Sequence, residues 1–178
     1  MPAAADLPTQ RLFIGLFPDA AVRAAIDAQR AQWRWPPGVR LTESSRLHMT
    51  LHFLGEVPIA SQVPLRESLG EVAVTPFDLS LGPGETWRNR IAVLRSDAPE
   101  ALIDLHARIG ARLALLRLAA AGMPWSRPHI TIARRCAGAV PPGQAQPIPW
   151  RVTEFLLVRS RTAPPIRYEV LSCHAAQC

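Results

Sequence analysis

The sequence predicts an α+β protein, and three observations support this class. Apolar residues alternate at strand spacing in some stretches and recur at helical spacing in others, and the two kinds of stretch follow one another along the chain. The 178 residues are 48% apolar, enough to bury one sizeable core, so we expect residues 1–178 to form a single domain without a linker. The same pattern, His-x-Thr followed by an apolar residue, also occurs once in each half of the chain.

The first half of the chain has the order strand, helix, strand, helix. Pro18-Asp19 is a typical helix start, and Val22, Ile26 and Trp33 then fall on one side of the helix. Trp35-Pro36-Pro37-Gly38 ends it. In order, we expect a strand at 11–16, a helix from 18 to about 33, a strand at 47–54, a turn at 55–58 and a helix at about 60–73.

The second half continues with strands on both sides of one long helix. That helix starts at Asp97-Ala98-Pro99-Glu100 and carries an apolar stripe, and Gly122-Met123-Pro124 stops it after about Ala121. The stripe consists of Leu102, Leu105, Ile109, Leu113 and Leu116. The other expected elements are strands at 77–81 and 90–95 joined by a turn at 82–84, a strand at 129–133, a loop at 138–149, and strands near 151–160 and 167–174.

The two His-x-Thr strings lie in expected strands. Side chains two residues apart on a strand point to the same face, about 6–7 Å from each other. His48 therefore shares a face with Thr50, and His129 shares a face with Thr131. The residues between and after them, Met49, Leu51 and Phe53 in the first strand and Ile130 and Ile132 in the second, are expected on the opposite, core-facing side.

This pattern suits in-line displacement at a phosphodiester. Imidazole titrates near neutral pH, so one histidine can take a proton from the nucleophile while the other gives a proton to the leaving oxygen. The non-bridging oxygens of the transition state need fixed hydrogen-bond donors, which Thr50, Thr131 and Arg134 can supply. Arg135 is the alternative to Arg134, because either arginine could turn inward at the end of the strand.

The strings LHMTLHFLGEV at 47–57 and RPHITIAR at 127–134 resemble the paired motifs of the two-histidine (2H) phosphoesterases, in particular the RNA 2′,3′-cyclic phosphodiesterase (2′-5′ RNA ligase, LigT-like) family. Segments 11–16, 34–37, 154–157 and 168–171 are also similar to that family, so the resemblance covers nearly the whole chain. It implies a bilobal fold of two pseudo-symmetric lobes, each with an antiparallel sheet and helices, and an active-site groove between them.

The resemblance also implies roles for the motif residues. His48 would be the proton donor, His129 the proton acceptor, and Thr50 and Thr131 would bind the phosphate. Members of the family open a 2′,3′-cyclic phosphate to a 2′-phosphate, and some join RNA ends through a 2′-5′ bond without a nucleotide cofactor. We therefore expect a metal-independent RNA 2′,3′-cyclic phosphodiesterase without cofactors, acting as a monomer on RNA ends, tRNA fragments among them.

Two other functions remain open. The same catalytic pair could act on 2′-5′ linked oligonucleotides or small cyclic nucleotides, or the chain could be a non-catalytic, arginine-rich RNA-binding module that grips phosphate. Phe13, Trp35 and Trp125 are candidates for stacking on a base, although core packing is an equal alternative for these aromatic residues. Arg127 is a candidate for contacting the RNA backbone, or it covers the rim of the groove without such a contact.

Charge and cysteine content fit this expectation. The formal net charge is +6, and all twenty basic residues are arginine, which attracts phosphate-rich ligands even if a coding bias explains the absence of lysine. Cys136, Cys173 and Cys178 have no disulfide or zinc spacing and are expected to be free thiols. His52, expected on the face of His48 and Thr50, could complete a metal site but lacks a carboxylate partner. The N-terminus has no signal-peptide pattern, so we expect a cytoplasmic protein.

Overall fold

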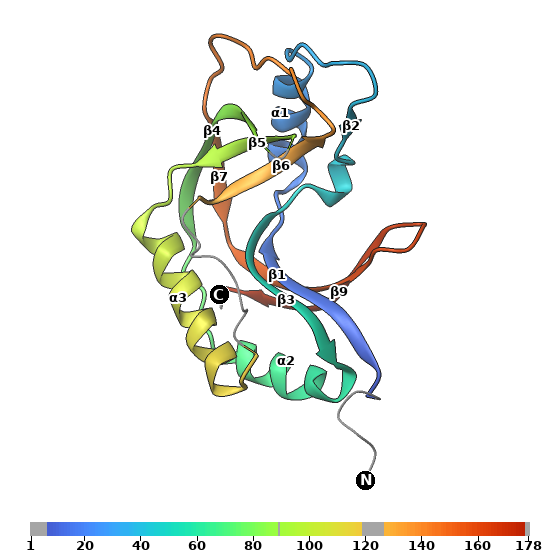
Figure 1. The fold of residues 1–178 in the computed structure, drawn as a ribbon. Helices are drawn as coiled ribbons and strands as arrows, with labels where there is room; N and C mark the ends of the chain where they lie inside the picture. The colour runs from blue at the N-terminus through green and yellow to red at the C-terminus, as the bar shows by residue number, and fades with distance from the viewer. Residues whose placement is uncertain (1–6, 89, 119–126, 177–178) are drawn as a thin grey trace.

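The fold is a curled antiparallel sheet with three α-helices, seen in a computed structural model that describes residues 7–88, 90–118 and 127–176 (Figure 1). In chain order the elements are β1 (Thr9–Leu16), α1 (Ala20–Arg30), β2 (Arg40–Leu41), the 3₁₀ turn η1 (Ser44–Arg46), β3 (Met49–Pro58), the 3₁₀ turn η2 (Ile59–Ser61), α2 (Gln62–Gly70), β4 (Phe77–Trp87), β5 (Ile91–Ser96), α3 (Glu100–Leu115), β6 (His129–Arg134), β7 (Ile148–Val152), β8 (Glu154–Arg161) and β9 (Arg167–Ala175). The α+β class expected from the sequence is confirmed.

The nine-stranded sheet consists of two halves, one with β7, β4, β5, β6 and β2 and the other with β3, β1, β8 and β9. Its strand order is β7-β4-β5-β6-β3-β1-β8-β9, with β2 beside β6, and every pairing is antiparallel. One residue pair, Met49 with Ile130, joins β3 to β6 at the centre. α1 packs on the half that contains β7, whereas α2 and α3 pack on the half that contains β3 and β9 (Figure 1). This is the two-lobed arrangement that the family resemblance implied.

One continuous core runs through both halves of the sheet. Leu12 and Met49 on one half and Leu94 and Ile130 on the other are completely buried and belong to the same cluster. Burying a side chain of this size is worth about 1.5–3 kcal/mol. The apolar stripe predicted for α3 is confirmed through Leu113, because its four leucine and isoleucine residues up to that point are buried.

Two predicted turns lie inside strands instead. β3 continues through Gly55 to Pro58, and Gly55 has φ +68° at a bulge where β1 and β3 shift register. β4 likewise continues through the glycine and proline residues at 82–84. Its pairing with β5 shifts register between Leu81 and Gly84, so the strand accommodates these residues without ending. Glycine and proline in a sequence indicate that regular strand pairing is interrupted. The interruption can be a bulge within a strand as well as a turn between two strands.

The other helix and strand boundaries differ less from those expected from the sequence. Asp19 caps α1, with its carboxylate accepting the backbone N–H of Val22 at 2.9 Å, but the helix ends at Arg30 rather than near residue 33. The expected strand at 151–160 is two strands, β7 and β8, separated by Thr153. α3 ends at Leu115, and the predicted stop at 122–124 lies outside the described residues. No described helix is long and apolar enough to cross a membrane.

Candidate active site

The junction of the two sheet halves positions the histidine motifs. Met49 and Ile130 lie opposite each other on β3 and β6, and both side chains are fully buried. Because side chains alternate along a strand, the residues on either side of this pair point to the other face. That face carries His48 and Thr50 from one lobe beside His129 and Thr131 from the other.

These four side chains line one pocket. Its volume is about 730 Å³, and Arg134 also lines it. Three further polar residues of the pocket, Arg40, Thr42 and Arg46, come from β2 and the segment that follows it. The pocket is therefore rich in hydrogen-bond donors and positive charge, which suits an anionic ligand.

A bulge in each motif strand sets which residues face the pocket. In β3, Gly15 pairs with Thr50 and Ile14 with His52, which leaves Leu51 as an extra residue. In β6, Val93 pairs with Thr131 and Ala92 with Ala133, which leaves Ile132 extra in the same way. Both bulges follow the threonine of the motif directly, and both extra residues are buried.

The bulge in β6 brings Arg134 into the pocket. In a regular strand Arg134 would point to the face opposite His129 and Thr131, because it lies an odd number of positions after each of them. The extra residue at Ile132 reverses that alternation, so Arg134 shares their face. Arg135 follows with φ +55°, as the strand ends.

The bulge in β3 also reverses Phe53. The sequence predicted Phe53 on the core-facing side with Met49 and Leu51, and this prediction is wrong, because the extra residue Leu51 puts Phe53 on the face of Thr50, where it is 46% exposed.

The same bulge moves His52 in the opposite direction, away from the pocket. The sequence predicted His52 on the face of His48 and Thr50, and this prediction is wrong, because Leu51 turns His52 toward α3. There the His52 ring stacks on His106, with centroids 4.0 Å apart, and its Nε2 donates to the His106 carbonyl at 2.9 Å. No group of His, Cys, Asp and Glu that could hold a metal ion occurs among the described residues.

From the stacked pair His52 and His106 we expect the protein to lose stability in mild acid. Burial lowers the pKa of His52 and, together with the charge of His52, lowers the pKa of His106 from 6.5 to about 4. Below pH 6.5 the unfolded chain therefore binds protons that the folded chain does not, so the free energy of unfolding falls as the pH drops from 6.5 toward 4. We expect His106→Phe, which keeps a ring but cannot titrate, to show a smaller drop in Tm between pH 7 and pH 5 than the wild type. An equal drop in both proteins would contradict this account.

The backbone holds both pocket histidines in the same way. His48 Nδ1 lies 2.7 Å from the carbonyl oxygen of Arg46, and His129 Nδ1 lies 2.7 Å from the carbonyl oxygen of Arg127. A carbonyl oxygen can only accept, so Nδ1 carries the hydrogen in both rings. Each neutral imidazole then has a lone pair on Nε2, which is the atom that remains for proton transfer.

The electrostatics of the pocket favour neutral imidazoles. Burial is the main cause that lowers the pKa of His48 and of His129 below 6.5, and the hydrogen bond to the carbonyl offsets part of it. The positive charge of Arg134 lowers the pKa of both rings, and His129 lowers that of His48. One cation thus acts on both histidines. A bound phosphate would oppose it and favour protonation of one ring.

Aromatic side chains enclose the His48 ring. The centroid of Phe13 is 4.8 Å away, that of Phe17 is 5.3 Å away and nearly parallel, and Tyr168 meets the ring edge-on at 5.3 Å. Phe13 was a candidate for stacking on a base, but it is 4% exposed and packs against His48 itself. Tyr168 comes from β9 and lines the pocket.

The remaining candidates for contact with RNA do not line the histidine pocket among the described residues. Trp35 does not line the pocket; it stacks on Trp33 with centroids 4.8 Å apart, and its Nε1 donates to the Arg30 carbonyl. Arg127 approaches the Trp87 ring at 6.0 Å, and its carbonyl holds His129. Trp125 lies outside the described residues.

Sequence reasoning missed Trp87 and Tyr168. Trp87 ends β4 and lines the pocket, and its ring centroid is 4.5 Å from that of His129. Tyr168 has the corresponding place beside His48, at 5.3 Å. Each histidine therefore has an aromatic neighbour from a strand distant in sequence. The available signal was weak: Tyr168 is the one tyrosine of the chain, within a segment already similar to the family.

Comparisons with known proteins agree with this geometry. Residues 17–164 match the model of the 2′-5′ RNA ligase superfamily. A protein of Escherichia coli (strain K12) named RNA 2′,3′-cyclic phosphodiesterase is 33% identical over 161 residues, which cover 86% of this chain and 89% of that protein. A protein of the same name from Geobacillus stearothermophilus is 31% identical over 149 residues, 70% of this chain and 44% of that protein.

Solved structures show the same fold. A crystal structure of a phosphoesterase superposes with a TM-score of 0.81 at 31% identity, covering 95% of this chain and 99% of that one. E. coli LigT complexed with 3′-AMP superposes with a TM-score of 0.77 at 30% identity, covering 96% of this chain and 100% of that one. E. coli LigT complexed with phosphate gives a TM-score of 0.78 at 30% identity, covering 96% of this chain and 99% of that one.

Proposed function

This chain belongs to the 2′-5′ RNA ligase superfamily, and from that premise we propose that it is a metal-independent RNA 2′,3′-cyclic phosphodiesterase. It hydrolyses the 2′,3′-cyclic phosphate at an RNA end to a 2′-phosphate. The relatives named for this reaction and the nucleotide-bound LigT structure support the substrate class. The observation that carries the proposal is the pair His48 and His129 in one pocket, each with Nδ1 on a backbone carbonyl.

The proposed reaction needs two proton transfers. His129 Nε2 takes a proton from water as its oxygen attacks phosphorus, and His48 Nε2, protonated, gives a proton to the departing 3′ oxygen. The bond from phosphorus to the 3′ oxygen breaks, which leaves a 2′-phosphate and a free 3′ hydroxyl. The assignment of donor and acceptor follows the family resemblance, and the matched hydrogen bonds of the two rings support a pair that can exchange these roles.

Three side chains are proposed to bind the phosphate. Thr50 and Thr131 follow the histidines at the same spacing and line the same pocket, so one hydroxyl can reach the phosphate from each lobe. Arg134 adds a permanent positive charge from the end of β6. Charge grows on the non-bridging oxygens in the transition state, and donors already fixed in place stabilise that charge.

The same groups can catalyse transfer to a second RNA. If a 5′ hydroxyl of that RNA replaces water as the partner of His129, attack on the cyclic phosphate forms a 2′-5′ bond, and the two proton transfers are unchanged. The proposal therefore includes 2′-5′ ligation. We further propose that the protein acts as a cytoplasmic monomer and that tRNA fragments are among its substrates.

Product analysis tests this function. We expect an oligonucleotide ending in a 2′,3′-cyclic phosphate to be converted to the 2′-phosphate product, with the same rate in the presence of a chelator, because two imidazoles supply both proton transfers. A 3′-phosphate product would overturn the assigned bond cleavage, and loss of activity on chelation with recovery on adding a metal would overturn the metal-free mechanism. Turnover restricted to 2′-5′ linked oligonucleotides or small cyclic nucleotides, or salt-sensitive binding without any product, would replace the proposed function.

A further inference from the structure

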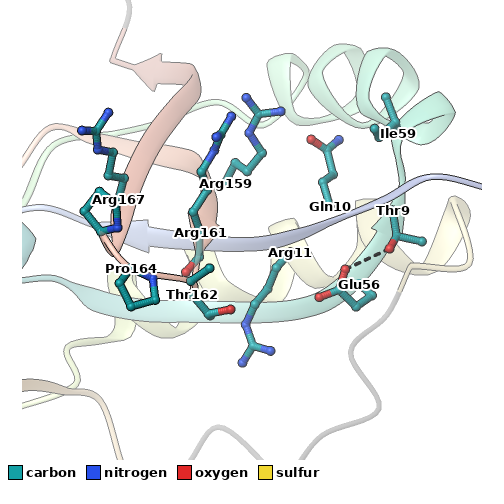
Figure 2. A pocket seen from close by; sticks show the side chains of 13 residues that line it. Thr9, Gln10, Arg11, Glu56, Ile59, Arg159, Arg161, Thr162, Pro164 and Arg167 are labelled. Carbon is teal, nitrogen blue, oxygen red and sulfur yellow. Dashed lines mark hydrogen bonds between the residues drawn. The ribbon is translucent and has the colours of Figure 1, made fainter.

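A second cavity opens where β1 and β8 separate. The two strands pair from Leu12 to Gly15 on β1, and Arg159 is the last residue of β8 in that pairing. Beyond this point β1 pairs with β3 and β8 pairs with β9, so the strands diverge. A cavity of about 620 Å³ lies between them, which we call the β1–β8 slot; Figure 2 shows its lining side chains.

Arginine dominates the lining of this slot. Arg11, Arg159, Arg161 and Arg167 line it, and Glu56 is the single acidic side chain among the described lining residues. Arg11 points to one side of β1, whereas the other three arginines point to the opposite side (Figure 2). Arginine side chains of the lining therefore extend to both sides of β1.

Two of these arginines lie directly opposite each other. Arg161 and Arg167 are register partners at the end of the β8–β9 hairpin, and both are exposed. Neither has a carboxylate within 4.0 Å among the described residues, since the nearby Glu169 is paired with Arg159. Like charges directly opposite on paired strands destabilise a sheet. An arrangement of this kind is stabilised when an anion binds between the two cations.

The histidine pocket contains the same arrangement. Arg40 on β2 lies directly opposite Arg134 on β6, and both line the pocket that we propose binds phosphate. The chain thus places two arginines in cross-strand pairing at both cavities. This parallel indicates that the slot also receives phosphate.

The slot and the histidine pocket are neighbours on the same elements. In the hairpin, Ile166 and Tyr168 line the histidine pocket, and Arg167 between them lines the slot. On β3, Thr50 lines the histidine pocket and Glu56 lines the slot. Arg167 points to the face opposite Ile166 and Tyr168, because side chains alternate along β9. An RNA strand that leaves the histidine pocket therefore reaches the slot along β3 on the side of Arg11, and it meets Arg161 and Arg167 on the other side of the slot.

An exposed aromatic residue lies between the two cavities on β3. Phe53 pairs with Phe13 and Thr50 pairs with Gly15, so Phe53 and Thr50 share a face. Phe53 is 46% exposed, and the guanidinium of Arg11 lies 4.7 Å from its ring centroid. Aromatic rings and arginine planes of this kind stack on the unpaired bases of single-stranded RNA.

We propose that the β1–β8 slot binds the phosphate backbone of the RNA substrate on the 5′ side of its reacting end, with a base stacked at Phe53. This inference rests on the proposed function, because the reacting end must occupy the histidine pocket. It makes the preferred substrate an oligonucleotide rather than a mononucleotide. The aromatic residue on the path favours RNA over an acidic polypeptide, which has no bases to stack.

The test compares a mononucleoside 2′,3′-cyclic phosphate with an eight-nucleotide RNA that has the same end. We expect the wild type to have a higher kcat/KM for the longer substrate. The double variant Arg161→Gln/Arg167→Gln should lower kcat/KM for the RNA by about tenfold, and the slope of log kcat/KM against log salt should become shallower by about 0.7 for each phosphate that the variant no longer neutralises. Its kcat/KM for the mononucleotide should be unchanged. Arg108→Gln on α3, which removes a single charge of the same kind from another surface, should match the wild type on both substrates.

Each failure has a different signature. If the wild type hydrolyses neither substrate, the proposed function fails. If it hydrolyses both with equal kcat/KM, or if the double variant keeps the preference for the longer RNA, the slot does not bind RNA and the inference is overturned. Competition by polyglutamate as strong as that by a non-reactive RNA of equal charge would also overturn it, because the slot would then bind acidic chains of any kind.

Discussion

Alanine in place of His48 or His129 should lower kcat/KM for a nucleoside 2′,3′-cyclic phosphate by about 10²–10⁴-fold in each case, because each substitution removes one of the two proton transfers. The two losses should not add. Without one imidazole the other has no concerted partner, so the double variant should be about as slow as either single variant. Steady-state kinetics on the three variants would measure this.

A matched control exists on the same strand. His52 lies two residues after Thr50, but the bulge at Leu51 directs it to α3 rather than to the pocket. His52→Gln should therefore keep kcat/KM near that of the wild type, although its Tm can change. Wild-type activity in His48→Ala or His129→Ala, with Tm and circular dichroism unchanged, would contradict the two-histidine mechanism.

The sequence was sufficient to predict what short-range patterns encode. Strand periodicity around His48 and His129 predicted two strands with their core-facing residues. Met49, Leu51, Ile130 and Ile132 are buried as predicted, whereas Phe53, beyond the bulge, is not. The apolar stripe of α3 was likewise readable. These features depend on neighbours within one strand or one helix, and the periodicity of a sequence reports such neighbours directly.

The bulges could not be predicted in this way. A regular strand would put His52 in the pocket and Arg134 on the opposite face, and the structure reverses both because Leu51 and Ile132 are extra residues in their strands. A bulge depends on how two strands compensate for a difference in length. The partner strand is far away in sequence, so no local pattern marks the extra residue.

Contacts between distant elements were also beyond the sequence. Tyr168 of β9 and Trp87 of β4 become neighbours of His48 and His129 through strand order, which one sequence does not specify. The β1–β8 slot has the same origin, since Arg11 and Arg161 are 150 positions apart and meet where two strands diverge. The abundance of arginine predicted a phosphate-binding surface but not its place.

Substitution of Arg134 by glutamine should have two separate effects. The loss of a fixed cation beside the phosphate should lower kcat/KM by about 10²-fold, the usual cost of removing one donor to a developing negative charge. The pH dependence should also change, because the charge of Arg134 lowers the pKa of both His48 and His129. Without that charge both pKa values rise, so a higher pH is needed to obtain neutral His129. The acidic limb of the kcat/KM profile therefore moves to higher pH.

Arg135→Gln is the control, because it removes the same charge one residue further on. Arg135 does not line the pocket, and neither histidine owes any of its lowered pKa to it. Its kcat/KM and its acidic limb should match those of the wild type. If Arg135→Gln instead reproduced the loss and the shift while Arg134→Gln did not, the alternation in β6 would have to be regular and the bulge at Ile132 could not be the feature that selects the phosphate-binding arginine. The pair of variants thus tests in solution whether one extra residue in a strand decides which of two adjacent arginines acts on the reaction.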